Sequence, residues 1–506
     1  MKKHLLSAAI LLAATASYAQ QSLNTADHAV RYTTDNVTGT ARFRGLSGAM
    51  GAVGGDLSAM SVNPAGSAIF NYNTGTATFS SYNISNESQY FGTKQKKNDN
   101  SFDLNQLGAV FVFNNSNEEA TINKFTFGFN YENTNSFHNT IYTRGTNPNN
   151  SISNYFLNYA NGINEGPISQ NTLNNAYYED LNYNDQQAFL GYNAYLFDPS
   201  GNANGPAYVN NVPATGNYYH ENYTTASGYN GKVALNFATQ LKKRLYLGIN
   251  LNVHFTDYIE NTRFYEDTGN FATGSPQVIR FDNERYTYGG GFSLNVGAIY
   301  KITESLRAGV AYESPTWMRL QNEVTQRISS YCPECEASNP TADTFIFDPN
   351  TTMVFDDYTI KTPSKWTASL AYIFGKSGLI SADYSIRDYS NTEYKSSGYG
   401  TVNDQLSSSL DVASTFKIGA EYRIQRFMLR GGYRYEQSPY KNGTTIGDLN
   451  GASGGVGYSF GTSRVDLAYS WYQRKTQNAM FSTGLTDAPQ IKSTFNNISL
   501  SYTIDL

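Results

Sequence analysis

A strict alternation of apolar and polar residues runs through much of this 506-residue chain. The clearest stretch is RLYLGINLNVHFTDY at 244–258, where every second residue is apolar and the residues between them are polar or small. Side chains of a β-strand point alternately to its two faces, so this stretch predicts a strand with one apolar and one polar face. The pattern recurs at 124–131, 291–300, 365–374, 415–424, 464–471 and 497–506.

Counting such stretches gives fourteen candidate strands, most of them close to the roughly 9–11 residues that a tilted strand needs to cross a bilayer. They are 75–84, 105–113, 123–133, 228–239, 245–258, 286–300, 305–313, 365–374, 378–388, 413–424, 427–436, 451–460, 463–473 and 496–506. Short and long connections alternate between them, and the longest are 134–227, 259–285 and 314–364. Brief periplasmic turns and extended outer loops are typical of antiparallel outer-membrane barrels. The sequence therefore predicts an all-β, 14-stranded antiparallel transmembrane β-barrel over residues 75–506.

Composition agrees with a barrel better than with a soluble sandwich. The chain has 41 Tyr and 29 Phe but a mean hydropathy of only −0.48. In a barrel wall only every second residue must be apolar, so the average stays polar. The formal net charge of −5 gives no reason to expect nucleic acid as a partner.

The first nineteen residues have the features of a secretory signal peptide. Lys2 and Lys3 precede an apolar run at 5–16, and Ser17-Tyr18-Ala19 supplies small residues at a cleavage site. We expect the mature chain to start at Gln20, which is not the cysteine of a lipoprotein. Export and a barrel together predict a multi-pass protein of the outer membrane of a Gram-negative bacterium. The two cysteines, Cys332 and Cys335, lie in an expected outer loop, and we interpret them as a small loop disulfide.

Residues 20–74 precede the first candidate strand and are rich in Gly, Ala and Ser. The stretch GLSGAMGAVGGDLSAMSVNPAGSAIF at 45–70 ends in a motif of Asn63, Pro64, Ala65 and Gly66. Small residues allow close backbone approach inside a crowded lumen, so we predict a hatch that plugs the barrel. The glycines at 48, 51 and 54 follow no strand and are joined by no phosphate-binding lysine, so they do not indicate a nucleotide loop.

The hatch motif, the fourteen strands and the block at 361–391 (KTPSKWTASLAYIF…GLISADYSIRDYSN) resemble the FadL-type outer-membrane transporters of hydrophobic compounds. The likeness covers essentially the whole mature chain. It implies passive uptake of long-chain fatty acids or similar molecules, captured by outer loops and released by hatch rearrangement through a lateral opening at a kink in the third strand. Gly128 is the candidate for that kink. The family's capture groove usually comes from the third and fourth outer loops, whereas the second is the longest here.

A carboxylate-bearing ligand would need a lumen cation for its head. The candidates are Lys417, Arg423, Arg430 and Arg434 on inward strand faces, and Arg42 and Arg44 in the hatch. The alternative is that these residues form ion pairs with neighbours such as Glu421 and Glu436, which brace the wall.

Other functions remain open at the level of sequence. A receptor for another ligand such as haem, or a structural or adhesive barrel, would share the same strands. We find no nucleophile-elbow serine and no triad arrangement, so we expect no enzyme. No metal or other cofactor is expected. The expected partners are a hydrophobic ligand, outer-membrane lipids, lipopolysaccharide and the assembly machinery that reads the terminal strand, and we expect a monomer.

Overall fold

The computed structural model describes residues 23–34, 36–117, 119–163, 166–201, 206–214, 216–336 and 341–506. The expected signal peptide and the start at Gln20 lie outside these residues. Within them, no helix has the length and apolar character that a bilayer crossing requires.

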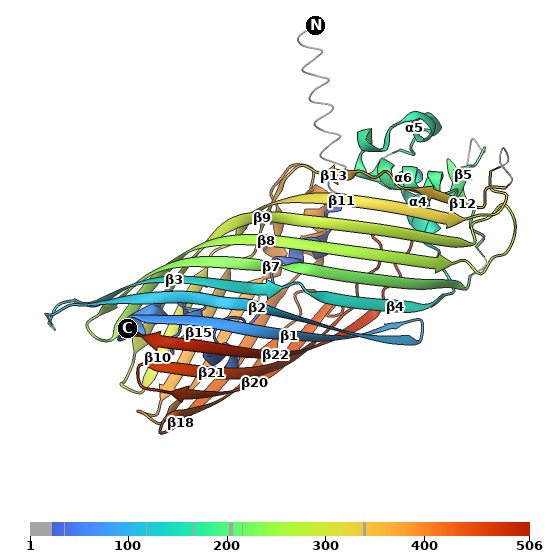
Figure 1. The fold of residues 1–506 in the computed structure, drawn as a ribbon. Coiled ribbons are helices and arrows are strands. Elements are labelled where there is room, and N and C mark those ends of the chain that lie inside the picture. Colours follow the sequence, from blue (N-terminus) through green and yellow to red (C-terminus); the bar gives the residue numbers. More distant parts are fainter. Residues whose placement is uncertain are drawn as a thin grey trace, which may run out of the picture.

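The wall of the molecule is a closed antiparallel barrel of fourteen strands (Figure 1). It closes because β1 pairs with both β2 and β22, which confirms the predicted fold class. In order around the wall the strands are β1 (Thr74–Tyr90), β2 (Thr93–Asn114), β3 (Ile122–Ser136), β7 (Tyr218–Leu241), β8 (Leu245–Asp267), β9 (Val278–Lys301), β10 (Leu306–Glu313), β15 (Lys365–Ile373), β16 (Gly378–Asp388), β18 (Val412–Ile424), β19 (Phe427–Glu436), β20 (Ile446–Ser459), β21 (Ser463–Thr476) and β22 (Gln490–Asp505).

The two faces of the wall follow the alternation in the sequence. On β8, Leu247, Leu251 and Val253 are exposed on the outer face, while Tyr246 and Asn250 are buried toward the lumen. An exposed apolar row is costly in water and favourable against lipid chains, so this row forms part of the belt that faces the membrane.

Several strands are much longer than the sequence predicts. β7 and β9 each have 24 residues, about twice what a crossing needs. The expected outer loops 134–227, 259–285 and 314–364 were therefore too long: β8 and β9 leave only residues 268–277 between them, and β11 (Trp317–Tyr331) continues the wall beyond β10. The outer face of these extensions is in water, so the apolar alternation stops there although the strand does not.

The third strand of the wall is interrupted. β3 ends at Ser136, and β4 (Asn139–Asn147) resumes on the same neighbour, β7. Between them Phe137 turns inward and packs edge-on against Tyr258, with ring centroids 4.8 Å apart.

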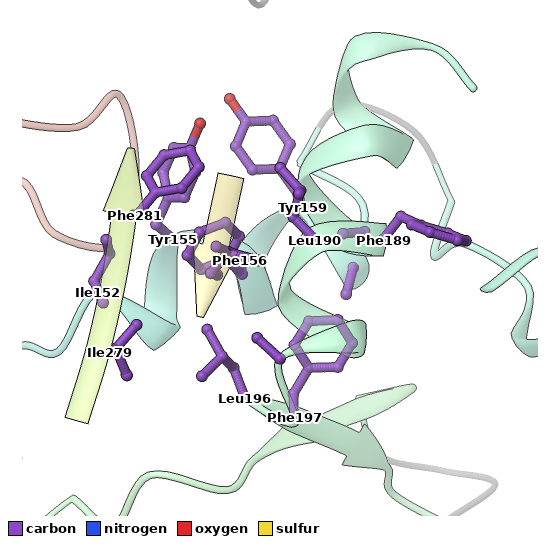
Figure 2. Packing of buried hydrophobic residues seen from close by; sticks show 14 of the residues in the cluster. Ile152, Tyr155, Phe156, Tyr159, Phe189, Leu190, Leu196, Phe197, Ile279 and Phe281 are labelled. Atoms are coloured by element: carbon purple, nitrogen blue, oxygen red, sulfur yellow. The ribbon is translucent and has the colours of Figure 1, made fainter. Parts of the chain in front are cut away.

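The second outer loop folds into a small helical layer over one end of the barrel (Figure 1). Figure 2 shows its core, in which Tyr155 and Phe156 of α4 lie against Phe281 of β9. The layer contains α4 (Ser153–Ala160), α5 (Gln170–Asn175), η3 (Tyr178–Asp180), α6 (Tyr183–Asn193), β5 (Phe197–Pro199) and β6 (Tyr208–Asn210).

The remaining outer elements are short. They are β12 (Thr344–Phe347), β13 (Thr352–Val354), β14 (Tyr358–Lys361), η4 (Tyr389–Asn391), β17 (Glu393–Tyr394) and α7 (Gly400–Ser409). Cys332 and Cys335, just after β11, are joined in a disulfide.

Candidate functional site

The N-terminal segment fills the lumen before the chain enters β1. Its elements are α2 (Ala26–Arg31), α3 (Ala41–Gly45), η1 (Ser58–Ser61) and η2 (Pro64–Ile69). Nearly every residue from 38 to 68 is buried, and α3 and η2 contact lumen-facing strands. Residues 36–70 are called the hatch below. They lie inside the barrel, as expected, rather than beneath it.

The Asn63-Pro64 turn packs against three glycines of the wall, and we call such a group of wall glycines a glycine seat. Gly248, Gly297 and Gly309 lie on the adjacent strands β8, β9 and β10. A Cβ added at Gly297 would lie 2.1 Å from the side-chain oxygen of Asn63, and one at Gly248 would lie 2.4 Å from the carbonyl carbon of Pro64. Only glycine leaves room for such an approach.

Asn63 also bonds the turn to its surroundings. Its amide nitrogen donates to the carbonyl oxygens of Gly51, at 2.9 Å, and of Ala298, at 3.1 Å. Its side-chain oxygen accepts from the backbone N–H of Ala65 and so caps η2. The motif therefore joins one part of the hatch to another and the whole hatch to the wall.

A second seat holds the other end of the hatch. Gly419 on β18 pairs directly with Gly432 on β19. A Cβ at Gly419 would lie 2.7 Å from the carbonyl oxygen of Leu46, and one at Gly432 would lie 2.5 Å from the carbonyl carbon of the same residue. Two docking points on opposite parts of the wall fix the hatch in one orientation.

Three of the predicted head-group cations, Arg42, Arg423 and Arg430, share the carboxylate of Glu421. Glu421 accepts from Arg42 Nε at 3.0 Å and from Arg430 Nε at 2.7 Å, and its other oxygen accepts from Arg423. Arg430 also donates to Asp466 at 2.7 Å. These arginines follow the bracing alternative, since the carboxylates already use their charge.

Arg44 is different. Its guanidinium is 2% exposed and donates to the hydroxyls of Ser80, at 2.9 Å, and Ser499, at 2.6 Å. It lies over the ring of Tyr82, and its Nε has no hydrogen-bond partner. Among the described residues no carboxylate forms an ion pair with Arg44, so a buried positive charge is held by neutral groups alone.

The last two candidates lie on the same strands. Arg434 pairs with Glu436 at 3.3 Å and lies over Tyr472. Lys417 borders a space of about 40 Å³ that is too small for a ligand. Arg434 has an ion-pair partner and Lys417 has no room for a ligand beside it, so both differ from Arg44.

The interruption of the third strand creates a seam in the wall. β2 pairs with β3 only from Gln106 to Asn114. The outer half of β2, Thr93–Leu104, therefore forms a backbone ladder with β1 alone. Side chains close the seam instead: Asn105 donates to the carbonyl of Asn133, and Thr140 donates to Asp99. Phe102, on the outer face beside the seam, is 70% exposed, which places the lower seam within the apolar belt.

Gly128 is not at this break. It pairs with Val110 and Asn236 in a regular ladder, and a Cβ there would lie 3.3 Å from Met60 of the hatch. Its inward direction agrees with the sequence, but the strand is interrupted nearer to its outer end, where Phe137 turns inward.

A cavity of about 230 Å³ lies behind the seam. Residues 135–139 form one side of it, and Arg44 lines it from the hatch. Its apolar lining comes from Val37, Ile84, Phe137, Leu449 and Phe495. A buried cation and apolar walls in one cavity suit an amphiphile with a negative head.

A larger cavity of about 740 Å³ opens beneath the outer loops. Tyr155, Tyr159 and Phe481 line its apolar part. The second and last outer loops supply these residues, in contrast to the third and fourth loops that the resemblance implies. The two cavities are neighbours that share Thr476, and the N-terminal segment runs between them, with Arg31 lining the outer one and Thr34 the inner one.

Charged residues of α2 and the wall form the other side of this outer cavity. Glu260 accepts from Arg285 at 2.8 Å and from Arg31 at 3.4 Å. Arg285 also donates to Nδ1 of His28 at 2.9 Å. Burial, and then the charges of Arg285 and Arg31, lower the pKa of His28 well below 6.5. His28 is therefore neutral at pH 7, which leaves its Nδ1 free of a proton and able to accept the hydrogen bond from Arg285.

Comparisons with known proteins agree with this architecture. The protein-family model described as BamG matches residues 208–504, and no curated protein matches the chain. A Pseudomonas aeruginosa FadL homologue has a similar structure, with a TM-score of 0.53, 12% identity, and coverage of 92% of this chain and 98% of that chain. The deltaS2 mutant of the TodX monoaromatic hydrocarbon channel gives a TM-score of 0.51 at 13% identity, covering 91% and 98%.

At such identities the structural similarity is one of fold. The family model, in contrast, spans more than half of the 506 residues. The chain belongs to the BamG family and has the barrel fold of the FadL homologues.

Proposed function

We propose that this protein is a passive outer-membrane channel for hydrophobic molecules, and that it takes those with an anionic head, such as long-chain fatty acids. The observation that carries the proposal is the seam at lipid height, backed by a cavity that contains the unpaired Arg44. The fold similarity to a FadL homologue and to a hydrocarbon channel supports the same class of ligand.

The proposed route begins in the outer cavity. The apolar chain of a ligand gains about 0.8 kcal/mol for each methylene that leaves water, which an open water pore would not provide. Tyr155, Tyr159 and Phe481 offer that surface. Arg31 and Arg285 share the single carboxylate of Glu260, and their excess positive charge attracts the head. The ligand then reaches the inner cavity when the segment between Arg31 and Thr34 moves aside.

In the inner cavity the head pairs with Arg44. A carboxylate out of water is costly unless it is paired and hydrogen-bonded, and an arginine without a carboxylate offers both. The ligand leaves sideways where side chains alone join β2 to β3 and β4, since no backbone ladder must break there.

The test is binding of oleate and of toluene to purified protein in nanodiscs, by isothermal titration calorimetry. We expect Arg44→Met to weaken oleate binding by about tenfold or more, because a charge-assisted hydrogen bond is lost, and to leave toluene binding unchanged. Arg327→Gln, which removes an exposed outer ion pair, is the matched control and binds both as the wild type does.

Two results would contradict the proposal. If neither oleate nor toluene binds saturably to the wild-type protein, the proposed transport function is wrong. If Arg44→Met weakens the binding of oleate and of toluene equally, Arg44 contributes to the packing of the hatch rather than to binding of the ligand head.

The BamG family match supports a second candidate, a role beside the machinery that assembles outer-membrane proteins. Its test is gentle extraction of the full-length protein, followed by affinity purification and mass spectrometry. Stoichiometric recovery of assembly proteins with no bound lipid favours this candidate, and recovery of a bound fatty acid with no partner favours the channel.

A further inference from the structure

A third cavity, of about 540 Å³, lies under the hatch at the periplasmic end of the barrel. The short turns at 374–377, 425–426 and 460–462 mark this end, and the hatch turn at Gly54 and Gly55 forms the roof. The channel proposed above does not use this cavity. Its lining includes five arginines: Arg42, Arg307, Arg423, Arg426 and Arg464.

The two buried carboxylates at this end, Glu421 and Asp466, are already paired with arginines. Both oxygens of Glu421 and both oxygens of Asp466 accept from arginines. Asp505, also in the lining, accepts from the hydroxyl of Thr74 at 2.8 Å. Arg430 bridges Glu421 and Asp466, Asp56 also lies near Arg42, and Glu304 lies near Arg307. Six guanidinium groups therefore face five carboxylates, Glu421, Asp466, Asp505, Asp56 and Glu304, and the surroundings of the cavity keep a net positive charge.

Two of the arginines have no carboxylate within ion-pair distance in the described part of the chain. Arg307 donates from Nη1 to the carbonyl of Val53 at 3.0 Å, and its buried Nε has no partner. Arg426 lies exposed in the turn between β18 and β19. They project into one cavity from β10 and from that turn.

We propose that the periplasmic cavity binds a phosphate-bearing anion. An anion with several oxygens suits a cavity lined by five arginines, and guanidinium groups bind phosphate oxygens through paired N–H donors. The hatch separates this cavity from the route of the hydrophobic ligand, and its five arginines favour an anion. The phosphate belongs either to a soluble periplasmic molecule or to the head of an inner-leaflet lipid.

The probe is inorganic pyrophosphate, titrated calorimetrically into the full-length protein in phosphatidylcholine nanodiscs. We expect saturable binding that falls by about tenfold or more in the double variant Arg307→Gln, Arg426→Gln, because two charge-assisted contacts are lost. Neither substitution leaves a carboxylate without its partner. Arg426→Gln alone, at an exposed turn, provides the same test with a smaller loss should the double variant fail to fold.

Arg244→Gln is the matched control. Arg244 is an exposed arginine in a periplasmic turn that does not line the cavity, so its loss should leave the affinity unchanged. A second arm repeats the wild-type titration in nanodiscs containing phosphatidic acid. Weaker pyrophosphate binding there assigns the site to a lipid head, and equal binding assigns it to a soluble phosphate. The proposal is wrong if the heats of pyrophosphate binding do not saturate, or if the wild-type protein and the double variant bind pyrophosphate with equal affinity.

Discussion

The arginines inside this barrel differ in function because their neighbours differ. Arg42 and Arg430 share Glu421, and removal of that one carboxylate would leave Arg42 buried without its ion-pair partner, while Arg430 would keep Asp466. Arg44 is surrounded by hydroxyls and one aromatic ring and has no carboxylate partner among the described residues, which is why we propose it for the ligand head. The sequence shows both kinds as isolated basic residues, and only the pairing separates wall bracing from ligand binding.

His28 makes the attachment of α2 dependent on pH. Its pKa is lowered by burial, by Arg285 and by Arg31, so the docked segment excludes a proton that the undocked segment accepts below about pH 6.5. Docking is therefore fully stable above pH 6.5 and loses up to about 1.4 kcal/mol for each pH unit below it, down to the lowered pKa. We expect faster hydrogen exchange at residues 26–31 at pH 5 than at pH 7.5, after correction for intrinsic rates. His28→Gln should remove most of that difference, and persistence of the full difference in the variant would contradict the assignment.

At the scale of elements, the hatch depends on glycines of the wall. Gly297→Ala would place a Cβ 2.1 Å from Asn63, so we expect the turn to move and the hatch to loosen. The measurement is ion conductance in planar bilayers, which should rise. Gly431→Ala is the matched control on β19, since its Cβ would meet nothing closer than 4.0 Å. Equal conductance in both variants would show that the seat does not hold the hatch.

The seam between β2 and β3 can be locked. Ser101 and Ser136 have their hydroxyls 3.5 Å apart across it, so a disulfide between Ser101→Cys and Ser136→Cys is expected to form. If ligands leave through the seam, oxidation should abolish oleate uptake and reduction should restore it. A disulfide between Thr367→Cys and Ser385→Cys, across the regular β15–β16 ladder, should have no effect. Uptake that continues in the oxidised seam variant would exclude this exit.

The sequence predicts the elements best where lipid imposes a pattern. All fourteen wall strands, including the Leu247–Val253 row, follow from alternation, because an outward polar residue in lipid is costly. The same pattern fails for the upper parts of β7, β8 and β9, whose outer faces meet water. The glycine seats were missed because contacts between residues such as Gly297 and Asn63, 234 positions apart, leave no local signal, although glycines in mid-strand already indicate close backbone approach.

On the scale of the whole molecule, the hatch divides the barrel into compartments of different chemistry. The outer cavity is aromatic with a charged side, the inner one is mainly apolar around Arg44, and the periplasmic one is cationic. A continuous pore would have a single environment. Under the proposed function, this division would let a hydrophobic ligand leave sideways while the periplasmic end stays closed to it.

Deletion of residues 36–70 tests this division. The lumen-facing side of the wall is largely polar, with buried residues such as Thr126, Asn236 and Asn252, so an emptied lumen should fill with water. We expect a large, steady conductance in planar bilayers together with the loss of saturable oleate binding, because Arg44 is removed with the hatch. Replacement of residues 150–212 by a short linker, in contrast, removes Tyr155 and Tyr159 of the outer cavity and should weaken oleate capture. Conductance should stay at the wild-type level, since the helical layer lies above the lumen. A hatch-deleted barrel that remains closed to ions would show that the wall or the outer loops seal the lumen, and the role assigned to the N-terminal segment would be wrong.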